Sequence, residues 1–269
     1  MRLKLTLEPV NNKSMAINYN YSFAAAIYKL LKFGSPQFAD FLHDLGFKSA
    51  GKTYKLFSFA VRFNKYLKIH NNYIDLNHQT LSLIVSSPLV EQFIKNFVLG
   101  TFSENSIEIM ADNIKSVFEI RQVEILNEPD FNNSAKFKLL SPMVVSSGEE
   151  VNGKRRNKFY RINDDPLEFN RVFNSNLYNK YELIYNKPYE GKPVLIRWDQ
   201  DYLDRKIKLK QRTTKKVSIL ADLKNPIDII GNVAPFELVG DPQLIKTGYQ
   251  CGFGEKNSMG FGLVEVIDE

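Results

Sequence analysis

The chain begins with a strict alternation of apolar and polar positions. Between Arg2 and Val10, Leu3 and Leu7 fall on one face of an extended segment, and charged side chains fall on the other. A period of two residues is typical of a β-strand with one face in the core and one face against water or a ligand. The sequence therefore predicts a strand at residues 2–10.

The period lengthens after residue 22. Apolar residues recur every three or four positions over residues 22–33, which predicts an amphipathic helix that ends at Gly34. Ser35 and Pro36 then supply an N-cap and an N1 proline, so a second short helix is predicted to run as far as Gly46. Its apolar stripe consists of Phe38, Phe41, Leu42 and Leu45.

The later segments repeat these two periods. In the first half we predict strands at residues 56–63, 68–76 and 79–85, a helix at 88–98 and strand-rich alternation at 106–126. In the second half we predict a long helix at 165–186 and strands at 136–145, 194–198, 206–210, 217–223 and 263–267. This order favours an α+β fold of ferredoxin-like (RRM-like) units over a doubly wound parallel sheet.

Turn-forming residues divide the chain near its middle. Asn, Pro, Asp and Ser are concentrated at residues 127–134. The 269 residues are long for one domain, since domains cluster at roughly 100 to 150 residues. We predict two tandem modules, residues 1–126 and 127–269.

Composition narrows the class of protein. With 43% hydrophobic and 13% aromatic residues, the chain can build packed cores, which excludes a disordered or fibrous protein. The net charge of +6 favours a polyanionic partner, with nucleic acid first. One cysteine, Cys251, excludes an internal disulfide and a multi-cysteine zinc site. No signal peptide or membrane span is visible, so we expect a cytoplasmic protein with no membrane partner.

A glycine-rich segment near the end of the chain carries the most specific pattern. Residues 248–262 contain five of the 14 glycines. Such glycines allow positive φ and close backbone approach, so the segment is a candidate anion cradle. Its expected RNA-binding residues are Gly252, Gly254, Lys256, Asn257, Ser258 and Gly260. The structural alternative is a tight hairpin between the last two strands. The spacing matches neither a Walker loop nor a dinucleotide fingerprint, which gives ATP and NAD little support.

This segment has the order Gly-Tyr-x-x-Gly-Phe-Gly-Glu-Lys-Asn-Ser-x-Gly-Phe-Gly from residue 248 to residue 262. It resembles the signature of the CRISPR-associated protein six family, the repeat-processing endoribonucleases of the RAMP superfamily. Similar residues also occur at positions 1–5, 19–21, 27–28, 41–43, 55–58 and 140–142. The resemblance covers nearly the whole chain and weakens over residues 161–239.

The resemblance implies tandem RRM-like folds and metal-independent cleavage of CRISPR repeat RNA, with no cofactor. A 2′-hydroxyl would attack the adjacent phosphorus and leave a 2′,3′-cyclic phosphate and a 5′-hydroxyl. The partners implied are repeat RNA (pre-crRNA and crRNA) and an interference complex of the Cascade type, and a homodimer is left open. The alternative is a catalytically inactive relative that binds repeat RNA within an effector complex.

Two aromatic side chains of the predicted helices point away from the core. On a helical wheel, His43 lies roughly 150° and Tyr28 about 130° from the centre of its apolar stripe. His43 also falls in the last helical turn, where carbonyl dipoles favour the imidazolium, so it suits a general acid. Tyr28, a poor base at pH 7, suits orientation of the 2′-hydroxyl.

In the family that the chain resembles, a tyrosine, a histidine and a lysine act together. The matching positions are Tyr28, His43 and Lys55, with Lys52 as the rival lysine. Both lysines stay open because residues 47–53 depart from the family pattern. His70 and His78 lie in turn-like stretches and are expected to be solvated.

Two basic runs are candidates to follow a phosphate backbone. The candidate RNA-binding residues are Lys154, Arg155, Arg156 and Lys158 in the first run, and Lys206, Lys208 and Lys210 in the second. Ile207 and Leu209 separate the lysines of the second run, which predicts a strand with three ammonium groups on one face. The structural alternative is a solvated edge strand protected by lysine.

Overall fold

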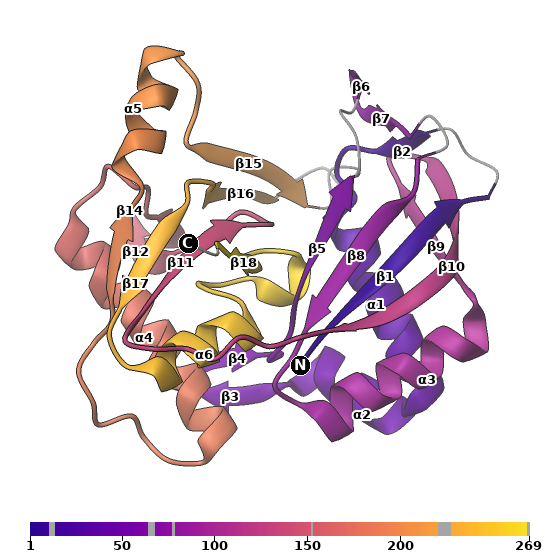
Figure 1. Cartoon of the computed structure of the whole chain (residues 1–269), viewed down its shortest axis with the longest axis horizontal. Helices are drawn as coiled ribbons and strands as arrows, with labels where there is room; N and C mark the ends of the chain where they lie inside the picture. Colours follow the sequence, from indigo (N-terminus) through magenta and orange to yellow (C-terminus); the bar gives the residue numbers. More distant parts are fainter. Residues whose placement is uncertain (11–13, 64–67, 77–78, 152, 220–226, 268–269) are drawn as a thin grey trace.

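Two antiparallel sheets organise the chain, as Figure 1 shows for the computed structural model. The structure describes residues 1–10, 14–63, 68–76, 79–151, 153–219 and 227–267. The strands of the first sheet end at Leu126, and those of the second begin at Ser134. The change of sheet thus falls in the turn-rich stretch where the sequence predicts the module boundary.

The first sheet has the strand order β5-β8-β1-β10-β9. Its strands are β1 (Arg2–Pro9), β5 (Ser58–Phe63), β8 (Leu81–Ser86), β9 (Ser106–Ala111) and β10 (Ile114–Leu126). β1 is central and antiparallel to both β8 and β10. Leu3, Leu5 and Leu7 are buried, which confirms the face predicted from the alternation.

Helices cover one face of this sheet (Figure 1). They are α1 (Asn20–Gly34), α2 (Pro36–Asp40), the π-helix η1 (Phe41–Leu45), the π-helix η2 (Val90–Ile94) and α3 (Lys95–Glu104). The predicted stripe of α1 is buried, including Phe23 and Ile27. α3 packs directly on α1, because a Cβ at Gly100 would collide with the carbonyl of Leu30.

The second sheet has the order β14-β17-β11-β18. It contains β11 (Ser134–Leu139), β14 (Leu195–Trp198), β17 (Phe236–Val239) and β18 (Val264–Val266). α4 (Pro166–Tyr185) and α6 (Pro242–Cys251) contribute to its core, in which Phe137, Phe173 and Phe253 are buried. Among the described residues, no helix combines the length and the apolar character needed to cross a membrane.

Smaller sheets of two or three strands accompany the two main sheets. They are β2 (Ser14–Ala16) with β7 (Tyr73–Asp75) and β6 (Lys68–His70), β3 (Phe47–Ser49) with β4 (Lys52–Tyr54), β12 (Ser146–Val151) with β13 (Lys154–Phe159), and β15 (Thr214–Ile219) with β16 (Ile227–Asn232). The single strand predicted at residues 68–76 is therefore a hairpin. The predicted strand at 217–223 extends past the described residues.

The strand predicted at residues 206–210 is wrong, because α5 (Gln200–Lys208) occupies this region. The Asp199 carboxylate caps the helix by accepting from the amide N–H of Tyr202 at 2.8 Å. Ile207 and Leu209 are both exposed, so their alternation with lysine marks no buried face. Positions 206 and 208 are about 200° apart on a helix, so no common face presents these lysines.

Arg2 joins the two halves. Although the alternation places it on the polar face of β1, its side chain is buried. Its guanidinium donates to the carbonyl oxygens of Val264 and Tyr249 and lies 3.4 Å from the centre of the Tyr249 ring. Burial lowers the pKa of Arg2 to about 10. The first strand of one half is thereby fastened to the last helix and strand of the other.

Candidate active site

The structure brings Tyr28, His43 and Lys55 together from three elements. The Tyr28 ring, on α1, meets the His43 ring of η1 edge-on with 5.2 Å between the ring centres. The Lys55 ammonium, which follows β4, donates to the backbone carbonyl of His43 at 2.7 Å. The three residues that the family resemblance groups together therefore lie next to one another in the structure.

A turn at Gly46 places Lys55 beside His43. Gly46 ends η1 with a φ of +63° and donates its N–H to the Phe41 carbonyl at 2.7 Å. A Cβ at this position would lie 2.8 Å from the backbone oxygen of Tyr54, so glycine lets the β3–β4 hairpin fold closely against the helix. The hairpin spans residues 47–54, where the sequence pattern had not indicated strands.

His43 is open to solvent, with 66% of its side chain exposed. The predicted orientation away from the core is confirmed, although the helix here has π geometry and Leu45, expected in the buried stripe, is 57% exposed. The wider π turn rotates the last residues relative to an α-helical wheel. Nδ1 of His43 lies 2.7 Å from a carboxylate oxygen of Asp44, which leaves Nε2 to face a ligand.

Tyr28 is half-buried and packs edge-on against Phe57, with 5.7 Å between the ring centres. Burial raises the pKa of its phenol above the ordinary value, and a hydrogen bond with Ser258 opposes this only in part. The phenol therefore stays protonated at neutral pH and acts as a hydrogen-bond donor. The contact with Ser258 also brings the glycine-rich segment to the cluster.

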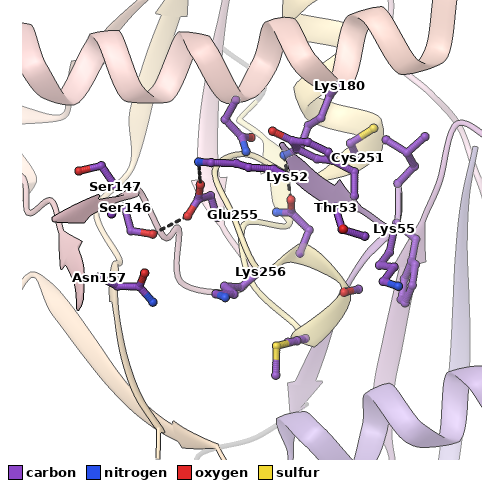
Figure 2. Close-up of a pocket in the computed structure, with 18 residues that line it drawn as sticks. Lys52, Thr53, Lys55, Ser146, Ser147, Asn157, Lys180, Cys251, Glu255 and Lys256 are labelled. Carbon is purple, nitrogen blue, oxygen red and sulfur yellow. Dashed lines mark hydrogen bonds and ion pairs between the residues drawn. The ribbon is translucent and has the colours of Figure 1, made fainter. Parts of the chain in front are cut away.

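The two candidate lysines have different surroundings. Burial lowers the pKa of Lys55, and the nearby Asp44 carboxylate opposes the shift. Lys52 instead forms an ion pair with Glu255 at 2.5 Å, and Glu255 also accepts from the Ser146 hydroxyl (Figure 2). The geometry therefore favours Lys55 beside His43, while Lys52 is held toward β12.

The glycine-rich segment connects α6 to β18, so it is not a hairpin between two strands. Gly252, Gly254 and Gly260 have φ values of +86°, +70° and +80°, yet they face packed protein. A Cβ at Gly254 would collide with the Val144 carbonyl, and one at Gly260 would lie 2.9 Å from the Phe59 ring. These glycines allow the segment to pack between the two halves, which argues against the open anion cradle predicted for them.

Asn257 is also largely internal, and its expected role in RNA binding stays a prediction. The side chain is buried, and its amide donates to the carbonyls of Phe253 and Phe261 at 3.2 and 3.0 Å. Ser258 is half-buried and Lys256 is exposed. Lys256, Asn257 and Ser258 all line the cavity between the two halves, and Lys256 and Ser258 are the more accessible of the three.

Lys180, which the sequence did not single out, holds this segment from α4. Its ammonium is fully buried and donates to the carbonyls of Gly252 and Gly254 and to Oδ1 of Asn257 at 2.7, 2.6 and 2.8 Å. Burial lowers the pKa of Lys180 to about 8. All three hydrogens of the ammonium are used, so Lys180 positions the segment and is not itself free for a ligand.

A cavity of about 460 Å³ lies between the two halves, beside the cluster of Tyr28, His43 and Lys55. The polar side chains that line it include Lys52, Lys55, Ser146, Asn157, Lys180 and Lys256 (Figure 2). Within the described residues, no group of three or more His, Cys, Asp or Glu side chains is placed to hold a metal ion.

A family model described as "CRISPR associated protein Cas6, C-terminal" matches residues 126–266, more than half of the chain. The chain belongs to this Cas6 family. The family model covers the second half, including the glycine-rich segment and α4, which anchors it.

Three individual Cas6 comparisons extend over the whole chain. CRISPR-associated endoribonuclease Cas6 1 of Methanocaldococcus jannaschii is 29% identical, over 100% of this chain and 94% of the relative. CRISPR-associated endoribonuclease Cas6 of Pyrococcus furiosus is 24% identical, over 99% and 90%. A solved structure described as a Cas6-related gene product from Pyrococcus furiosus has a TM-score of 0.79 at 23% identity, over 100% and 99%. The last comparison supports the α+β fold.

The two basic runs of this Cas6 chain lie on different elements. In β13, Arg156 and Lys158 are exposed, and the Lys158 ammonium lies 5.1 Å from the centre of the Tyr160 ring. The side chains of Lys154 and Arg155 are not among those that the structure describes. α5, which carries Lys206 and Lys208, projects at the end of the second half remote from α1 (Figure 1), and Lys210 follows it in a turn. The second run is therefore not part of the cluster around His43.

Proposed function

We propose that the chain is a metal-independent endoribonuclease that cleaves CRISPR repeat RNA to produce guide RNA. The observation that carries the proposal is the exposed imidazole of His43 beside a protonated phenol and a lysine ammonium. The endoribonuclease names of the Methanocaldococcus and Pyrococcus relatives support the reaction class.

The reaction needs no external nucleophile. The 2′-oxygen of RNA forms a bond to the adjacent phosphorus, the bond from phosphorus to the 5′-oxygen breaks, and the 2′-hydroxyl proton passes to solvent. The leaving 5′-oxygen takes a proton from a general acid, which leaves a 2′,3′-cyclic phosphate and a 5′-hydroxyl. Proper alignment and a source of positive charge are the remaining requirements.

Each member of the cluster suits one of these tasks. His43 is the general acid, with Nε2 directed to the leaving oxygen because Nδ1 is occupied by Asp44. Tyr28, kept protonated by burial, donates to the reacting group and orients the 2′-hydroxyl. Lys55 offsets the negative charge that grows on the phosphate. These roles rest on the geometry of the free protein and on the family resemblance.

The test is incubation of the purified protein with end-labelled repeat RNA in excess EDTA. We expect a shorter product with a 2′,3′-cyclic phosphate end, at a rate within about twofold of that without chelator, because no step uses a metal ion. A protein that binds the repeat but never shortens it would contradict the proposal and indicate an RNA-binding relative. Assembly with an interference complex and homodimer formation stay predictions.

Lys55 and Lys52 form a matched pair for mutation. We expect Lys55→Ala to slow cleavage by about 100-fold, because loss of one electrostatic stabiliser of a transition state costs 10²–10³. Lys52→Ala should slow it less than tenfold, since the Lys52 charge is shared with Glu255. Single-turnover rates at saturating protein measure both. The reverse order would assign the third member of the cluster to Lys52.

A further inference from the structure

The cavity between the two halves has walls from four parts of the chain. β4 and the residues after it form one wall, and the β12–β13 hairpin forms the facing one. α4 and the glycine-rich segment close the remaining sides (Figure 2). At about 460 Å³, the cavity has the size of pockets that hold small-molecule ligands, which span roughly 300–1,000 Å³.

Its charge favours an anionic ligand. The side chains that line it include one acid, Glu255, and four lysines, namely Lys52, Lys55, Lys180 and Lys256. Glu255 is already paired with Lys52, and Lys180 is held by three acceptors. Lys55 and the exposed Lys256 are therefore not neutralised by Glu255. Their positive charge suits a phosphodiester.

The inner surface also contains polar groups that suit a nucleobase. Asn157 is exposed on β13, where it pairs with Gly148 of β12, and both residues line the cavity. Asn176 is deeper, only 4% exposed, and its Oδ1 has no hydrogen-bond partner among the described residues. A buried acceptor without a donor is costly, so a ligand that carries the donor would be stabilised there.

The cavity also has an apolar wall. Tyr54, Leu56 and Phe57 are buried and line the same cavity. A base has flat apolar faces and polar edges, so a site of this mixed character fits a base that has left its stack. A simple inorganic anion would use only the lysines and leave the asparagines and the apolar wall without contacts.

The cavity is continuous with the cluster around His43. Lys55 lines it and donates to the His43 carbonyl, and Ser258 lines it and shares a hydrogen bond with Tyr28. We propose that the cavity binds one unstacked nucleotide of the RNA strand, within two positions of the scissile phosphate, with its base against Asn157 and Asn176. This inference rests on the proposed function, and it makes Asn157 a residue that positions the substrate.

An abasic scan combined with Asn157→Ala tests the inference. Repeat RNAs carry a single abasic unit at each position from three before to three after the cut. We expect one position within two of the cut at which the abasic unit slows wild-type cleavage at least tenfold, which one lost base contact of about 1.4 kcal/mol would produce. Asn157→Ala should slow intact RNA about tenfold and slow that abasic RNA less than threefold further, because both changes remove the same contact.

Asn132→Ala is the matched control, since Asn132 is exposed in the segment between the two sheets and outside the cavity lining. This variant should cleave intact RNA at the wild-type rate. The sensitive abasic unit should slow its cleavage as much as it slows cleavage by the wild type. The inference is overturned if no position in the scan is sensitive, or if Asn157→Ala slows intact and abasic RNA by the same factor.

Binding affinity is measured with the same RNAs, each made uncleavable by a 2′-deoxy unit at the cut. The sensitive abasic unit should weaken binding to wild type about tenfold and binding to Asn157→Ala by less than threefold. If intact RNA is never cut but this pattern holds, the proposed function fails and the nucleotide site stands. If intact RNA is cut and the pattern is absent, only the nucleotide site fails.

Discussion

Replacement of His43 by alanine is expected to lower the rate of RNA cleavage by about 10³-fold, within the 10²–10⁴ that a positioned general acid contributes. The side chain is 66% exposed and contacts Tyr28 at its rim, so its removal leaves no cavity in the core. Repeat binding should therefore stay within about twofold of wild type, because no phosphate-binding charge beyond the imidazole is lost. Single-turnover cleavage and equilibrium binding measure the two effects separately.

His70→Ala is the matched control for this variant. His70 is also exposed, but it lies on β6 and stacks on Tyr73 with 5.3 Å between ring centres, away from the cluster. It should cleave at the wild-type rate. Unchanged cleavage by His43→Ala, or equal losses in both variants, would refute the role assigned to His43.

Lys180→Met is expected to reduce the free energy of unfolding by about 4 kcal/mol, since each buried acceptor left without its donor costs about 1–3 kcal/mol. Methionine fills a similar volume but leaves two carbonyls and the Asn257 oxygen without their donor. Chemical denaturation measures the loss. Lys187→Met, at an exposed position just after α4, should stay within about 0.5 kcal/mol of wild type.

The lowered pKa of Lys180 also makes the free energy of unfolding depend on pH. The folded pKa of Lys180 is about 8 and its ordinary value is 10.5, so between these pH values the unfolded state binds more protons. Stability from this group therefore rises with pH across that window. The stability difference between wild type and Lys180→Met should widen from pH 8 to pH 10. A difference that narrows would contradict the lowered pKa.

Strong periodicity made part of the fold predictable. β1, α1 and α4 were recognisable because their apolar residues face one core, and Asp165 with Pro166 marks the start of α4. α5 was missed because its Lys-Ile-Lys-Leu-Lys alternation reflects exposed residues and no buried strand face. The β3–β4 hairpin was missed because its three-residue strands are too short for a period to be detected.

The candidate site was predictable to a different extent. A helical wheel was enough to orient His43 and Tyr28, since each depends on its own helix. Lys180 and Asn257 could not be paired in this way, because 77 residues separate them and the contact exists only after α4 has packed against the glycine-rich segment within the second half. The glycine pattern was informative, but its positive φ values serve packing between the halves more than an open phosphate cradle.

The most direct test of the account removes one oxygen atom from the substrate. Repeat RNA with a single 2′-deoxy nucleotide on the 5′ side of the cut lacks the nucleophile but keeps every phosphate and base. In EDTA, we expect the protein to bind this RNA within about twofold of the all-ribose repeat, because phosphate contacts are retained, and to leave it uncut. Cleavage of the deoxy RNA at the same position would contradict attack by the 2′-hydroxyl and with it the mechanism assigned to Tyr28, His43 and Lys55.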